Sequence, residues 1–244
     1  MALPDLKSAP RRAGLFERAI TRPLMRPAQI SAVANLSENF RLIDFEGEAL
    51  KNCAWSPGDK VQVKLDDGLI TRTYTPIEWD TAAGTTRIIA YCHGAGPGAE
   101  WARSAEAGDK RQLMGPHGSL DLKRLSPATV LFGDETSFGL AVSLYRSSGS
   151  GSDQRFIFEV NDRQEAAYIL DRLGVTPAVV IERQREDAHL SELAEAIWRC
   201  SRPATAFVLS GKASSIQHVS RALVNGFETR RDIQGRRLIG PRAR

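Results

Sequence analysis

The chain has 244 residues, is 42% hydrophobic and 25% charged, and carries a formal net charge of +4 at pH 7. These values are those of a globular protein and exclude a disordered chain. No apolar run approaches the roughly 18 residues of a membrane span, and the N-terminus lacks the apolar core of a signal peptide. We therefore expect a cytoplasmic protein without a membrane partner.

The three cysteines and four histidines are too scattered for a disulfide framework or a metal site. Cys53, Cys92 and Cys200 lie far apart, and burial in the core is the simplest expectation for the first and last of them. We expect no metal, so any redox chemistry requires an organic cofactor.

The positive charge is concentrated at the C-terminal end. Residues 221–244 hold seven Arg against Glu228 and Asp232, a net charge of +5, which leaves −1 for the rest of the chain. These arginines either form a solvated tail or attract an anion such as a phosphate. Nucleic acid is not an expected partner, because no aromatic residues interleave with the charges.

Residues 1–26 are expected to form an N-terminal extension with a helix over residues 14–20. Residues 27–125 show short strand patterns separated by turns. The expected strands are residues 29–34, 40–45, 60–64, 69–75, 86–92 and 112–114. Several short strands at this spacing predict a small antiparallel barrel.

In residues 126–225, strand and helix patterns alternate. The expected strands are residues 129–132, 155–160, 178–181 and 204–209, and the expected helices are residues 136–147, 163–173, 190–199 and 214–225. This alternation predicts a parallel α/β sheet with right-handed crossovers. The predicted fold class is a two-domain one, an antiparallel β-barrel followed by an α/β domain, with residues 226–244 as a basic tail.

A cation, an aromatic ring and a hydroxyl follow one another at strand spacing in Arg72-Thr73-Tyr74-Thr75. Arg72 and Tyr74 share one face of a strand. A guanidinium can fork onto a pyrophosphate, a tyrosine can lie flat on an isoalloxazine ring, and a threonine hydroxyl can meet the polar edge of that ring. The alternative is an ordinary half-buried strand.

A glycine-rich turn, His93-Gly94-Ala95-Gly96-Pro97-Gly98, then runs toward Trp101-Ala102. With the preceding strand, it is what a flavin dinucleotide site requires. His93 alternatively forms only structural hydrogen bonds, and Trp101 alternatively packs in the core.

Gly133-Asp134-Glu135-Thr136 follows the first strand of the α/β part directly. Ligands bind α/β sheets at the carboxyl ends of parallel strands. Asp134 and Glu135 are also expected to cap the next helix, and the two roles can coexist.

In order and spacing, residues 72–76, 93–102 with 115–118, and 133–136 resemble the ferredoxin-reductase-like flavoproteins, and most of all the siderophore-interacting protein family of FAD-dependent ferric-siderophore reductases. The resemblance implies an FAD-binding barrel over residues 27–125 and a nicotinamide-binding α/β domain over residues 126–225. It implies NADH or NADPH as electron donor.

The resemblance also implies a role for each matching residue. Arg72 would neutralise the FAD pyrophosphate, and the expected catalytic residues at the flavin ring are Tyr74, Thr75 and Thr136. The other expected cofactor-binding residues are Thr73 in the strand, Tyr91 and His93 at the ribose and adenine end, Gly94, Gly98 and Ala99 in the phosphate turn, Trp101 and Ala102 at the start of the helix, and Gly133, Asp134 and Glu135 beside the nicotinamide.

Two departures concern ligand binding. Many relatives carry a second Arg two residues after the Thr of the first motif, where this chain has Ile77. After the last strand, Ser210-Gly211-Lys212 replaces the Ala-Gly-Glu segment of relatives. Lys212 either contacts the nicotinamide phosphate or the siderophore, or it is a solvated lysine.

The expected function is reduction of a ferric siderophore through FAD by a monomeric enzyme. One alternative is a flavin reductase for a ferredoxin or flavodoxin carrier. The other is a siderophore-binding module without catalysis.

Overall fold

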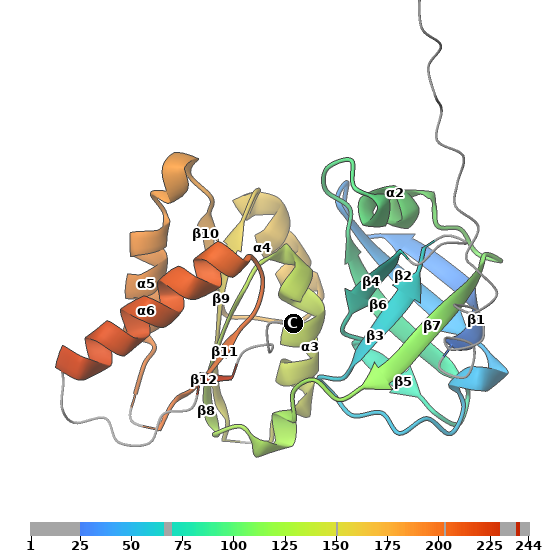
Figure 1. The fold of residues 1–244 in the computed structure, drawn as a ribbon, viewed down its shortest axis with the longest axis horizontal. Coiled ribbons are helices and arrows are strands. Elements are labelled where there is room, and N and C mark those ends of the chain that lie inside the picture. The colour runs from blue at the N-terminus through green and yellow to red at the C-terminus, as the bar shows by residue number, and fades with distance from the viewer. Residues whose placement is uncertain (1–24, 66–69, 150, 203, 230–237, 240–244) are drawn as a thin grey trace, which may run out of the picture.

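The structure, a computed structural model, describes residues 25–65, 70–149, 151–202, 204–229 and 238–239. They form two lobes side by side, each built on its own sheet (Figure 1). The helix predicted over residues 14–20 and most of the basic tail lie outside the described residues. Among the residues described, no helix is both long and apolar enough to cross a membrane.

The first lobe is a seven-stranded antiparallel sheet that curls into a barrel without closing, in the order β4-β3-β7-β1-β2-β6-β5. The predicted barrel is therefore confirmed, with β4 and β5 as its two edges. Its strands are β1 (Met25–Asn35), β2 (Phe40–Glu46), β3 (Lys60–Lys64), β4 (Thr71–Tyr74), β5 (Glu78–Asp80), β6 (Thr85–Tyr91) and β7 (Lys110–His117). The sequence did not predict β5, because only Trp79 of its three residues is buried. A 3-10 turn, η2 (Glu48–Leu50), follows β2.

The second lobe is the predicted parallel sheet, in the order β10-β9-β8-β11-β12. Its strands are β8 (Ala128–Gly133), β9 (Asp153–Val160), β10 (Ala178–Glu182), β11 (Ala206–Leu209) and β12 (Leu238–Ile239). Its helices are α3 (Phe138–Ser147), α4 (Arg163–Arg172), α5 (Leu190–Arg199) and α6 (Ala213–Thr229), and its 3-10 turns are η3 (Leu122–Arg124), η4 (Glu135–Ser137) and η5 (Arg185–Asp187).

Helices cover both faces of this sheet. Consecutive strand residues point to opposite sides, so a strand of consecutive apolar residues has two apolar faces to bury. In β8, Leu131 packs with α3 and α4, whereas its neighbours Val130 and Phe132 pack with α5 and α6. Both faces are therefore apolar, as a buried parallel sheet requires.

The lobes meet along α3 and α4. Phe138 at the start of α3 stacks on Phe40 of β2, with ring centroids 5.3 Å apart. Ser143 Oγ donates to the carbonyl of Pro76 at 2.9 Å. In α4, the Glu165 carboxylate accepts from the hydroxyl of Ser37 at 2.6 Å. These contacts fix the carboxyl edge of the parallel sheet against the barrel.

Candidate functional site

Arg72 and Tyr74 lie on the edge strand β4 and both face one short helix, α2 (Pro97–Ser104). The Arg72 side chain crosses the first turn of α2, where a Cβ on Gly98 would come within 2.9 Å of its Cγ and Nε. Its only described hydrogen bond goes from Nη1 to the neighbouring carbonyl of Thr71, at 2.9 Å. The exposed guanidinium thus lies beside a helix N-terminus with no carboxylate partner among the described residues. Both side chains contact α2, as expected for two residues predicted to share one face of the strand.

Tyr74 is half-buried, and its ring lies 5.9 Å from that of Trp101, centroid to centroid. Burial raises the pKa of its phenol well above the usual range, and the nearby Cys92 adds to the effect. The phenol is protonated at physiological pH, and a half-buried aromatic ring offers a surface on which another ring can stack.

The glycine-rich turn comprises residues 93–96, and the helix begins earlier than the sequence predicted. Pro97 is its first residue, because Pro suits the first helical position and the extended Gly96 precedes it. The prediction that Trp101 and Ala102 begin the helix is wrong. Both belong to the barrel core, and Ala99 is buried as well. Gly94 has φ of +70°, and nothing lies within 4 Å of a Cβ built there.

Two rings and a carboxylate link this turn to the second lobe. His93 stacks on Tyr91 with centroids 4.5 Å apart and an angle of 18°. The Tyr91 hydroxyl lies 3.2 Å from Oε1 of Glu135 and accepts from Nδ2 of Asn161 at 3.0 Å. Burial raises the pKa of Tyr91 to about 12, so this phenol is a neutral bridge between the lobes.

The carboxylates of the 133–136 segment are engaged inside the protein. Asp134 Oδ1 accepts from the Thr136 backbone at 2.9 Å and from its hydroxyl at 2.5 Å, which is the predicted capping. Glu135, 4% exposed, accepts from Nη1 of Arg183 at 3.1 and 3.0 Å. Neither carboxylate faces solvent as a free ligand group.

Thr75 and Thr136 both lie where the lobes meet. Gly139 in the first turn of α3 backs onto the Thr75 carbonyl, which a Cβ there would approach to 2.7 Å. Thr136 is exposed just before this turn. Ile77, at the position of the second Arg of relatives, is buried among apolar side chains of α3 and has a packing role.

Lys212 follows β11 at the same edge of the sheet and is exposed. Its Nζ lies 3.3 Å from Oδ1 of Asp187, after β10. The preceding Gly211, with φ of +101°, lies against Asp134, whose carboxylate a Cβ would approach to 2.7 Å. The carboxyl ends of β8, β10 and β11 therefore converge.

Sequence reasoning missed a buried polar cluster at this edge. His189 Nε2 lies 3.0 Å from Oε2 of Glu159, and both side chains are at most 1% exposed. Because His189 Nδ1 accepts from the backbone of Gln184 at 3.2 Å, Nε2 carries the proton and donates to Glu159. Arg183 lies 3.8 Å from the other oxygen of Glu159. The one sequence signal for this cluster was that Arg183 directly follows β10 and so lies at the carboxyl end of a parallel strand.

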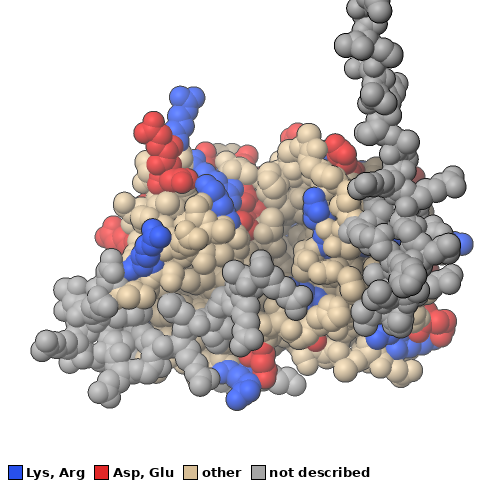
Figure 2. All heavy atoms as spheres, viewed as in Figure 1, with Lys and Arg blue, Asp and Glu red and all other residues tan. Residues whose placement is uncertain are grey.

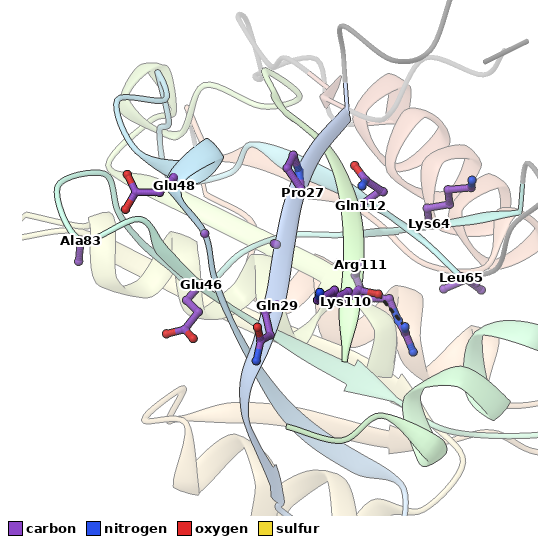
Figure 3. Close-up of a pocket in the computed structure, with 12 residues that line it drawn as sticks. Pro27, Gln29, Glu46, Glu48, Lys64, Leu65, Ala83, Lys110, Arg111 and Gln112 are labelled. Atoms are coloured by element: carbon purple, nitrogen blue, oxygen red, sulfur yellow. Dashed lines mark hydrogen bonds between the residues drawn. The ribbon is translucent and has the colours of Figure 1, made fainter. Parts of the chain in front are cut away.

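One hollow lies elsewhere, on the outside of the barrel (Figure 3). Its volume is about 960 Å³, and Gln29, Glu46, Lys64 and Lys110 are among its walls. None of its described lining residues is aromatic, so it offers a flavin no stacking surface. In the space-filling view, the surface is also hollowed between the lobes, with Lys and Arg side chains on the barrel side (Figure 2).

Residues 58–120 match the family model of the siderophore-interacting FAD-binding domain. The family resemblance predicted from the sequence is confirmed over this segment, which is 63 of the 244 residues. It contains Arg72, Tyr74, the glycine-rich turn and α2. A search of curated protein sequences gave no significant match.

Solved structures share the two-lobe fold. A siderophore utilization protein from T. fusca is 21% identical, with a TM-score of 0.69 over 88% of this chain and 90% of its own. The siderophore-interacting protein of Aeromonas hydrophila is 17% identical, with a TM-score of 0.68 and 89% of each chain covered. A ferredoxin NADP+ reductase from Neisseria gonorrhoeae, bound to FAD and NADP, is 13% identical, with a TM-score of 0.62 over 83% and 91%. The fold is that of ferredoxin-reductase-like flavoproteins.

The residues present fit an FAD. The missing Cβ of Gly98 leaves room for the Arg72 stem against α2, so a guanidinium and a helix N-terminus offer donors to one anion. Tyr74 is half-buried and neutral two residues away. A pyrophosphate attached to an aromatic ring system matches this pairing.

Proposed function

We propose that this protein is an FAD-dependent reductase that transfers electrons from NADH or NADPH to the ferric ion of a siderophore and releases Fe(II). The bound flavin would accept one hydride from the nicotinamide and return its two electrons singly, so that one nicotinamide oxidised serves two ferric ions. Iron(II) holds the hard oxygen ligands of a chelator less tightly than iron(III), which frees the metal.

The observation that carries this proposal is the Arg72–Gly98 contact beside Tyr74, within the segment that matches the FAD-binding model. We assign FAD binding to residues 27–125, with Thr73, His93 and Gly94 along the same edge, and nicotinamide binding to residues 126–225.

The protein residues would bind and orient rather than transfer protons. Tyr74 would exclude water from one face of the flavin ring, and Thr75 would donate a hydrogen bond at its polar edge. Thr136 would lie at the nicotinamide side of the junction, held by Asp134. Lys212 would attract the anionic ferric chelate or the phosphate of the donor, since its described partner Asp187 is itself half exposed.

The test is an anaerobic absorption measurement on purified protein reconstituted with FAD. We expect NADH or NADPH to bleach the flavin band, and a ferric siderophore to restore it while a ferrous-specific dye develops colour. Retention of FAD without bleaching by either nicotinamide rejects the reductase. Failure to retain FAD at all rejects the cofactor assignment as well.

The structural likeness to ferredoxin reductases favours one alternative, a reductase for a ferredoxin or flavodoxin carrier. Rates of reoxidation by a ferric siderophore and by oxidised ferredoxin, measured on the same reduced protein, separate the two. Faster reoxidation by ferredoxin at equal concentration supports the alternative.

A further inference from the structure

We propose that Arg103 is a positioning residue for the dinucleotide half of FAD. It would hold the glycine-rich turn, residues 93–96, in the conformation that binds phosphate. This inference rests on the proposed function, because it names how the same site takes a dinucleotide rather than a bare flavin ring.

Arg103 reaches back from the last turn of α2 to the turn that precedes the helix. Its Nη2 donates to the carbonyl of Cys92 at 3.0 Å and to the carbonyl of Gly94. The turn therefore folds onto α2 and is closed by one guanidinium. Gly94 supplies the positive φ of +70° that this closure needs.

These two bonds decide which way the backbone donors of the turn face. In a planar trans peptide, the carbonyl and the following N–H point in opposite directions. Because the carbonyls of Cys92 and Gly94 point at Arg103, the N–H groups of His93 and Ala95 point away from it. Neither N–H donates to a backbone carbonyl in the described part of the chain. They are free to meet an anion.

The helix that carries Arg103 is itself fixed to the barrel. Arg41 of β2 donates from Nη1 to the carbonyl of Ala102 at 2.9 Å. Trp101 and Ala102 are buried in the barrel core. Arg103 thus ties the glycine-rich turn to a helix that is packed into the barrel, and the turn directly precedes the first helical residues, which include the Gly98 of the Arg72–Gly98 contact.

The experiment compares Arg103→Ala with Arg103→Lys and with the control Arg199→Ala. Arg199 is an exposed helix arginine in an i,i+4 pair with Glu195, so its loss removes the same charge far from the turn. Dissociation constants are measured for FAD and for riboflavin, which lacks phosphate. We expect Arg103→Ala to weaken FAD about tenfold and leave riboflavin within about twofold. Arg103→Lys should recover part of the loss, and Arg199→Ala should change neither constant.

Hydrogen exchange of the flavin-free protein supplies a second measurement. In Arg103→Ala, the N–H of Cys92, which donates to the carbonyl of Asn39 at 2.8 Å, should exchange faster, while β6 and β7 stay unchanged. Equal weakening of FAD and riboflavin, or faster exchange throughout the barrel, means that Arg103 only stabilises the fold and overturns the inference. Unchanged FAD binding overturns it too. Wild-type protein that binds no FAD rejects the proposed function itself.

Discussion

The two lobes offer their polar groups to the junction in opposite ways. On the barrel side, Arg72 is exposed beside α2 with no described acidic partner, and the turn of residues 93–96 keeps free backbone donors. On the α/β side, Asp134 and Glu135 are buried and held chiefly by groups of their own lobe, and Glu135 also accepts from the Tyr91 hydroxyl of the barrel.

Groups available to bind a ligand therefore differ from groups that stabilise the folded chain: the first are exposed and unpaired, and the second are buried and paired. An exposed guanidinium makes its strongest bonds only when an anion arrives. A buried carboxylate must be paired in the folded chain itself, or the chain is destabilised. Under the proposed function, the barrel would supply the affinity for FAD, and the acidic cluster of the α/β lobe fixes the sheet edge opposite it.

The largest effect is expected from Arg183→Ala. It leaves Glu135 and Glu159 buried without their cation, so the free energy of unfolding should fall by about 3 kcal/mol. Urea unfolding measures this loss, and the exposed Arg185→Ala is the control, expected within about 0.5 kcal/mol of wild type. FAD affinity of the folded variant should hardly change. Unchanged stability with lost FAD affinity contradicts the contrast between the lobes.

Arg72→Ala tests the barrel side of the same contrast. The charge-assisted bonds to the pyrophosphate would be lost, so FAD should bind about 30-fold to 100-fold more weakly, or about 2–3 kcal/mol. The unfolding free energy without FAD should stay nearly unchanged, because the guanidinium is exposed. The FAD affinity of Arg72→Lys should lie between those of wild type and Arg72→Ala, since an ammonium cannot bind two oxygens in a forked geometry. A stability loss without an affinity loss would make Arg72 a structural residue.

Gly98→Ala should move stability and binding in opposite directions. Alanine favours the helix by up to about 1 kcal/mol over glycine, so α2 should gain stability. The new Cβ, 2.9 Å from Arg72 Cγ and Nε, displaces that side chain and should weaken FAD about tenfold. Thermal unfolding and a flavin fluorescence titration measure the two effects. Tighter FAD binding would show that Arg72 need not lie against α2.

The smallest effect concerns pH and the Tyr91 bridge. Burial raises the pKa of Tyr91 to about 12, from a usual value near 10. The folded state therefore holds this proton more tightly, and the stabilisation is complete below pH 10 and lost as pH rises toward 12. Tyr91→Phe should unfold at a lower temperature than wild type at pH 8, and the gap should narrow above pH 10. A constant gap between pH 8 and pH 11 contradicts the raised pKa.

The sequence was sufficient for the architecture because each lobe has its own periodicity. Short strands separated by turns predicted the barrel, and the strand–helix alternation predicted the parallel sheet, with α5 at residues 190–199 as expected. The start of α2 was misplaced because its capping Gly96 and Pro97 read as part of the glycine-rich turn.

Only the part of the candidate site that follows from residue type and local spacing could be predicted from the sequence. Arg72 and Tyr74 could be paired by strand spacing. Arg183, which pairs with the buried Glu135, lies 48 residues away from it along the chain. No local sequence pattern joins the two residues. The role of Arg103 depends on a turn folding back through Gly94, which spacing along the chain does not specify.

The most direct test of the FAD site is a fluorescence titration of wild-type protein with FAD, alongside Arg72→Ala and Tyr74→Ala. We predict saturable binding of one FAD per chain with quenching of the flavin, and marked weakening in both variants. Equal binding by all three proteins would contradict a flavin held on β4 against α2.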